Sequence, residues 1–177
     1  MDEANKNENH RDFYDTYNTE LGIIEPDEDE TLLTVDNWED IMVEVVLDSG
    51  ACRHVMARES APGYQVQDSS ASRRGLGFIV SNGERIPDDG PFVLNLDADY
   101  DQGSVTRLAA TFQVADLTRP LMSVSQLCEQ GFRVEFRDTQ ALVIDQSGRT
   151  ACRFQRSGQL YTSQMTLKAP EPFPRPS

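Results

Sequence analysis

The fold of this chain is decided at positions 45–51, which read Val45-Val46-Leu47-Asp48-Ser49-Gly50-Ala51. The apolar run that begins at Ile41 is rich in β-branched side chains, and this composition predicts a buried β-strand. The Asp-Ser-Gly that follows predicts a tight turn where the strand ends. We therefore expect the Asp48 carboxylate to stand at a rigid, apolar turn.

A strand followed by Asp-Ser-Gly and a small residue is the pattern that aspartic proteases use. Their chemistry needs two carboxylates about 3 Å apart, which share one proton because both cannot ionise. The ionised carboxylate takes a proton from the attacking water, and the protonated one stabilises the developing oxyanion. The sequence holds one such motif. We therefore predict a catalytic turn of Asp48, Ser49 and Gly50, completed by a twofold symmetric homodimer.

A second acid follows an apolar run within the same chain. Residues 142–148 read Leu-Val-Ile-Asp-Gln-Ser-Gly, with one residue too many between Asp145 and the glycine for a catalytic turn. Too little chain follows Asp145 to build a second lobe. We interpret this stretch as an ordinary turn, with a two-aspartate site inside one chain as the alternative.

The body of the chain is predicted to be mostly β-structure. Asn82-Gly83 between two apolar runs predicts a hairpin over 78–86, because both residues tolerate positive φ. One short helix is expected within 121–131, with Ser123 as N-cap and Gly131 just past the end. Further strands are expected at 92–96, 105–114, 132–136, 141–144, 150–154 and 160–162.

Charge and proline content divide the chain into three parts. Of the 30 acidic side chains 14 lie in residues 1–40, beside only two basic ones. We expect 1–37 to be a disordered acidic arm, either a solubilising tail or a linker. We expect residues 38–164 to form the folded domain and 165–177 to be a disordered proline-rich tail. Nucleic-acid binding is not expected, because such binding depends on Lys and Arg.

The remaining composition points to a soluble, cytoplasmic protein. The N-terminus has no basic region followed by an apolar core, and no apolar run is long enough to cross a bilayer. The three cysteines form no C-x-x-C pair, and we expect reduced thiols buried as small apolar side chains. No cofactor or metal is expected. His54 could act as a base or, with Cys52, bind a metal, but a structural role behind the turn is favoured.

Three sequence blocks, in this order, resemble the protease region of copia-type retrotransposon Pol polyproteins, a branch of the retropepsin-like aspartic proteases. Residues 47–56 are similar to the family's "LDSGAS-x-HM". Residues 80–87 are similar to its "G-D-G-S-x-I-P" hairpin, and 121–132 to "LLSVSQL…GY". Residues 156–161 also resemble its "GGLY" stretch. The resemblance spans 41–162.

This resemblance implies an all-β fold, a retropepsin-like closed β-barrel with one short C-terminal helix. Asp48 would be the catalytic acid, and the hairpin within 77–90 would be the flap that covers the substrate. The flap residues expected at the substrate are Val80, Ser81, Asn82 and Gly83. Residues 121–123 would take the place of the apolar pair and glycine that precede the helix in retropepsins, with Ser123 in place of that glycine.

The expected function is hydrolysis of peptide bonds in the element's own polyprotein by a homodimer. The expected partners are thus a polypeptide substrate and a second copy of the chain. Two alternatives stay open. One is a catalytically silent domain of the same fold that acts in binding or dimerisation, and the other is the fragment of a decayed element.

Overall fold

Strands dominate the computed structural model, which describes residues 21–23 and 38–171. This confirms a mostly β-sheet architecture, while the retropepsin-like barrel stays a prediction. The strands are β1 (Leu21–Ile23), β2 (Ile41–Asp48), β3 (Val55–Met56), β4 (Gly77–Ile79), β5 (Arg85–Pro87), β6 (Pro91–Asp101), β7 (Ser104–Val114), β8 (Leu121–Ser123), β9 (Arg133–Phe136), β10 (Gln140–Ile144), β11 (Thr150–Ser157) and β12 (Leu160–Leu167).

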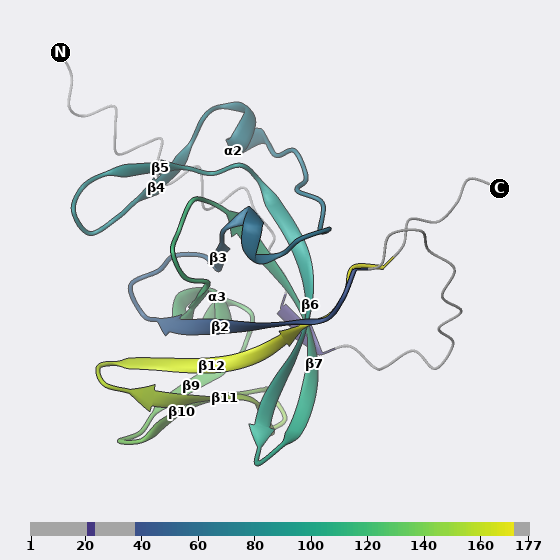
Figure 1. The fold of residues 1–177 in the computed structure, drawn as a ribbon. Coiled ribbons are helices and arrows are strands. Elements are labelled where there is room, and N and C mark those ends of the chain that lie inside the picture. Colours follow the sequence, from purple (N-terminus) through teal and green to yellow (C-terminus); the bar gives the residue numbers. More distant parts are fainter. Residues whose placement is uncertain (1–20, 24–37, 172–177) are drawn as a thin grey trace.

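Six of the strands pair in a closed circuit, in the order β6, β7, β3, β8, β2, β12 and back to β6. β2 is central to it, with β8 parallel on one side and β12 antiparallel on the other. The β12–β6 and β3–β8 contacts that close the circuit are short. Strands β11, β10 and β9 extend the sheet from β12, below β2 in Figure 1.

Alternating side chains of these strands fill one continuous core. In β2, Val43, Val45 and Leu47 point inward, as the β-branched run predicts. The largest fully buried side chains come from β6, β7 and β11: Phe92, Phe112 and Phe154. The core therefore supports β2 along its whole length up to Asp48.

The helical content departs from the prediction of a single helix. The expected helix is present as α3 (Val124–Glu129), and Ser123 is its N-cap, as predicted. There is also a 3-10 turn at Arg58–Ser60 and a short helix α2 (Ser70–Arg73). α2 begins in a stretch expected to be loop, because Ser69 and Ser72 cap each other's backbone N–H.

Two predicted boundaries shift once strand pairing is seen. Leu121 and Met122, expected within the helical stretch, form β8 together with Ser123, because these residues pair with the end of β2. β6 and β7 run through most of the expected loop to a tight turn at Gln102-Gly103, where both residues have positive φ.

The folded part also extends beyond the predicted limits of 38–164. β12 continues to Leu167, with Ser163, Met165 and Leu167 buried at alternate positions. The prediction of disorder from residue 165 is therefore wrong at its start. The prediction for the arm is wrong at Leu21–Ile23, which pairs with β7. The other residues of the arm and residues 172–177 lie outside the described part.

The predicted hairpin forms as β4 and β5, a separate two-stranded sheet. Its turn differs from the expected one, because only Gly83 has positive φ. The Gly83 N–H donates to the Val80 carbonyl, and the Val80 N–H donates to that of Glu84. These bonds define a three-residue loop with a glycine bulge. In Figure 1 the hairpin projects on the side at which β2 ends.

In the described ranges, no helix is long and apolar enough to cross a membrane.

Candidate functional site

Asp48 lies at the carboxyl end of β2, where the buried strand reaches the surface. The residue before it, Leu47, is buried, whereas Asp48 is half-buried and Ser49 is exposed. The Gly50 N–H donates to Asp48 Oδ1 at 2.7 Å. This bond closes the predicted turn and holds one carboxylate oxygen in place.

Gly50 is needed for space rather than for backbone conformation. Its φ is not in the left-handed region, unlike that of most glycines in this chain. A Cβ at this position would lie 3.3 Å from Asp48 Oδ1. Glycine thus leaves room beside the carboxylate, which any larger residue would crowd.

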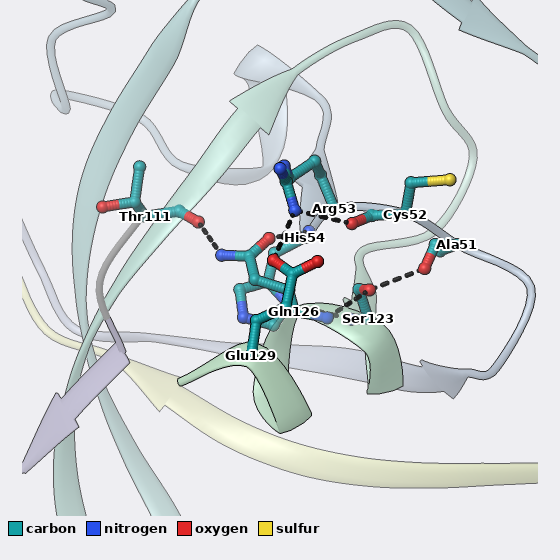
Figure 2. Close-up of polar contacts among 8 residues, drawn as sticks. All are labelled: Ala51, Cys52, Arg53, His54, Thr111, Ser123, Gln126 and Glu129. Atoms are coloured by element: carbon teal, nitrogen blue, oxygen red, sulfur yellow. Dashed lines mark hydrogen bonds and ion pairs between the residues drawn. The ribbon is translucent and has the colours of Figure 1, made fainter. Parts of the chain in front are cut away.

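The far end of the turn is tied to the start of α3 (Figure 2). Ser123 is the register partner of Asp48 in the parallel β2–β8 pair. Its Oγ donates to the Ala51 carbonyl at 2.6 Å and accepts from the Gln126 N–H at 3.1 Å. One serine therefore caps α3 and binds the turn that carries Asp48.

His54 lies behind the turn and is fully buried. Its Nδ1 accepts from the Ser123 backbone N–H at 2.8 Å, and the backbone N–H of His54 donates to Gln126 Oε1 at 2.7 Å. Burial, followed by the nearby charge of Arg53, lowers the pKa of His54 to about 3. These contacts agree with the structural role favoured from the sequence.

Arg53 and Cys52 complete the segment between the turn and β3. Arg53 is buried and pairs with Glu129 of α3 at 3.0 Å, and it also donates to the Cys52 carbonyl. The Cys52 sulfur points away from this cluster in Figure 2. No group of three or more His, Cys, Asp or Glu in the described ranges is placed to hold a metal ion.

A groove of about 480 Å³ opens beside Asp48. Among the described residues that line it, Asp48 is the one acid and Arg119 the one base. Most of the wall is apolar, and Phe136 and Tyr161 meet edge to face in it, with ring centres 5.1 Å apart. The lining residues are Val46, Leu47, Asp48, Ser49, Leu117, Thr118, Arg119, Leu121, Phe136, Gln159, Leu160 and Tyr161.

The structure brings Asp48, Ser49 and Gly50 together but leaves the hairpin tip apart. Asp48 and Ser49 line the groove, whereas none of Val80, Ser81, Asn82 and Gly83 does. The last three of these are exposed. In one chain, therefore, the predicted flap does not cover the Asp48 carboxylate.

Asp145 forms the turn predicted for it and borders a different hollow. Its Oδ1 accepts from the N–H and Oγ of Ser147 and from the Arg149 N–H. The hollow beside it is lined by Gln130, Phe132 and neighbouring residues, none of which lines the groove of Asp48. The two acids do not form one site.

The cysteines depart in part from the prediction of buried thiols. All three are free, but Cys52 and Cys128 are exposed. Cys152 is buried as expected, and burial raises the pKa of its thiol to about 12.

Sequence reasoning missed several residues around Asp48. The sequence predicts Ser123 as a helix cap and as the counterpart of the retropepsin glycine, but not its bond to the Ala51 carbonyl, and it does not single out Gln126. A serine followed three residues later by glutamine is a capping-box signal. Gln126 instead uses its side chain to hold the His54 backbone and the Thr111 carbonyl. The groove residues Phe136, Leu160 and Tyr161 lie in predicted strands, but no local signal places them beside Asp48, because only strand pairing brings them there.

No family model, curated protein or solved structure matches this chain. The family resemblance therefore stays a prediction carried by the sequence blocks.

Proposed function

We propose that this chain is one half of a retropepsin-like aspartic endopeptidase of the copia type. The observation that carries the proposal is the placement of Asp48. Its carboxylate ends a buried strand, receives one hydrogen bond from its own turn and borders an apolar groove. A carboxylate held in this way can exchange a proton with water at a bound peptide.

The strand pairing supports the finer fold assignment within this proposal. The circuit through β6, β7, β3, β8, β2 and β12 agrees with a small closed barrel. The parallel β2–β8 pair sets Asp48 beside Ser123 just before α3. This order of a catalytic turn, an apolar strand and a helix matches the arrangement implied by the sequence resemblance.

The second carboxylate comes from a second copy of the chain. Asp48 is alone among acids in its groove, and Asp145 borders a different hollow. A twofold axis beside Asp48 would bring its twin within reach, so that the pair shares one proton and activates one water. The water attacks the peptide carbonyl directly.

The groove favours a polypeptide substrate with an apolar side chain near the scissile bond. Its apolar wall includes Leu121, Phe136 and Leu160, the last two of them 47% and 42% exposed. Burial of this surface against an apolar side chain of the substrate would lower the free energy of binding. The hairpin β4–β5 would close over the bound chain as the flap, and the substrate would be the element's own polyprotein.

The test is cleavage of a mixture of unfolded polypeptides as a function of enzyme concentration. Specific activity should fall steeply on dilution and track the dimer fraction from sedimentation, because half-sites are inactive alone. Pepstatin should inhibit it, and Asp48→Asn should show only background cleavage. Specific activity that does not depend on concentration, or cleavage by Asp48→Asn, would overturn the proposal.

A catalytically silent domain of the same fold is the second candidate. It is favoured by one observation, that the hairpin tip does not line the groove of Asp48. In the same experiment this candidate predicts a dimer by sedimentation without cleavage at any concentration.

A further inference from the structure

We propose that His54 is a positioning residue for the Asp48 turn and that it holds this turn only as a neutral imidazole. The catalytic consequence rests on the function proposed above, but the structural part does not. It applies to the turn whether or not the chain cleaves peptides.

Ser123 is associated with both ends of the turn. It is the register partner of Asp48, where the turn begins, and its Oγ binds the Ala51 carbonyl, where the turn ends. A shift of Ser123 would therefore move the Ala51 carbonyl, where the turn ends. The orientation of the Asp48 carboxylate depends on where Ser123 stands.

His54 holds Ser123 in place through a hydrogen bond to its backbone. A backbone N–H can only donate, so the 2.8 Å contact from Ser123 requires an unprotonated Nδ1. The backbone of His54 is held in turn, since its backbone N–H donates to Gln126 Oε1 and its carbonyl accepts from the Gln113 N–H. The imidazole ring packs against the ring of Phe112, with the two ring centres 5.2 Å apart.

The surroundings of the His54 ring disfavour a second proton on it. With Nδ1 accepting, the one ring proton sits on Nε2, which is buried with no hydrogen-bond partner in the described part of the chain. Burial is the main reason that the pKa of His54 falls to about 3. A charged imidazolium would also lose the Ser123 bond.

The charged groups around His54 do not favour the protonated ring. Arg53, its neighbour, opposes a second positive charge, and Glu129 of α3 is paired with Arg53. The residues that contact His54 from β7 and β8 are Phe112, Gln113 and Ser123, and all three are uncharged. Nothing in these elements offers a counter-charge to an imidazolium.

The neutral His54 makes the stability of the fold depend on pH on the acid side. An unfolded chain takes up a proton on this histidine near its usual pKa of 6.5, whereas the folded chain does not until about pH 3. Stability from the neutral ring is therefore complete above pH 6.5 and is lost as the pH falls below it. The folded chain keeps the neutral ring down to about pH 3, so between pH 6.5 and 3 acid lowers the stability of the fold without releasing the turn.

A buried carboxyl titrates in the opposite sense and has to be separated from this effect. Burial raises the pKa of Asp88 to about 6. Ionisation of Asp88 destabilises the fold as the pH rises from about 4 to 6, so acidification relieves that penalty. Because Asp88 is the same in every variant below, differences between variants isolate His54.

The experiment compares three variants with wild type between pH 7.5 and 4. His54→Asn keeps an acceptor near the Nδ1 position but cannot gain a proton. His54→Leu keeps similar volume without an acceptor. Leu96→Val, in the core away from the turn, is the control for general loss of packing. The readouts are unfolding equilibria, kcat and KM at saturating dimer, and the amide resonance of Gly50, whose N–H binds Asp48.

We expect the ratio of unfolding constants between wild type and His54→Asn to change about tenfold per pH unit below pH 6.5. Leu96→Val should keep the wild-type pH dependence. His54→Leu should lower kcat about tenfold or more with little change in KM and shift the Gly50 resonance. His54→Asn should restore much of that kcat.

Parallel pH dependences of wild type and His54→Asn would overturn the proposal. So would a His54→Leu variant with wild-type kcat and Gly50 resonance. Should His54→Leu not fold, His54→Asn against wild type decides. Should wild type not cleave at all, the proposed protease function fails, and the unfolding slope and the Gly50 resonance still decide whether His54 holds the turn.

Discussion

Two aspartates of this chain end apolar strands at turns that contain serine and glycine, yet the turns differ in what they leave free. At Asp145, one carboxylate oxygen accepts three hydrogen bonds from its own loop and the other pairs with Arg149. At Asp48, the carboxylate receives one, from Gly50, within the described ranges. Both carboxylate oxygens of Asp145 are therefore bound by its own loop, whereas in the described ranges Asp48 has one oxygen bound by its turn and borders the groove.

The source of support differs in the same way. The Asp145 turn is held by residues within four positions of it. The Asp48 turn is held by Ser123, which lies far away in the sequence at the junction of β8 and α3 and is itself bound by His54. Support from behind leaves the front of a carboxylate accessible, which a reactive group needs. The same short motif therefore leaves its carboxylate covered or open, depending on which residues bind it.

The largest expected effect separates the two acids by activity. Asp48→Asn should lower cleavage by about a thousandfold or more, because an amide cannot take the proton from water. Asp145→Asn should change cleavage less than about twofold. Initial rates at equal dimer concentration measure both. Equal losses in the two variants would remove the distinction drawn between the turns.

Mixing the proteins sharpens the same test. Asp48→Asn added to wild type should inhibit it by forming mixed dimers, while Asp145→Asn should not. Absence of inhibition, with mixed dimers present by sedimentation, would contradict a shared site.

A smaller effect is expected from the glycines of the two turns. Gly50→Ala places a Cβ 3.3 Å from Asp48 Oδ1, so cleavage should fall about tenfold with little change in stability. Gly148 has φ +86° and open space around it, so Gly148→Ala should cost about 1 kcal/mol of stability without affecting cleavage. Denaturant unfolding and initial rates measure both variants. The opposite assignment of the two effects would contradict the comparison.

The smallest effect concerns acid stability. The hydrogen bond from Ser147, with the other bonds of its loop, lowers the pKa of Asp145. Its contribution to stability is therefore present above the usual pKa of 3.8 and is lost as the pH falls through the lowered value. The stability difference between wild type and Asp145→Asn should shrink below about pH 4 in thermal unfolding. Asp40 and Asp99, whose pKa values are also lowered, are common to both proteins and cancel. A constant difference down to pH 2 would contradict this account.

Local patterns predicted much of the secondary structure. The apolar run before Asp48, the glycine in the hairpin and the serine cap of α3 each act through neighbours in sequence. Predictions were wrong where distant pairing outweighed the local pattern. Leu121 and Met122 suit a helix, but their pairing with β2 places them in a strand. Met165 and Leu167 lie near the prolines, yet pairing with β2 keeps them in β12.

The sequence by itself determined that Asp48 ends a buried strand and turns at Gly50, because strand propensity and turn chemistry are local properties. Only the tertiary structure decided what surrounds that carboxylate. His54 and Ser123 are 69 positions apart, and Phe136 and Tyr161 come from later strands. Side chains so far apart meet only after the sheet has formed, since strand register brings them together.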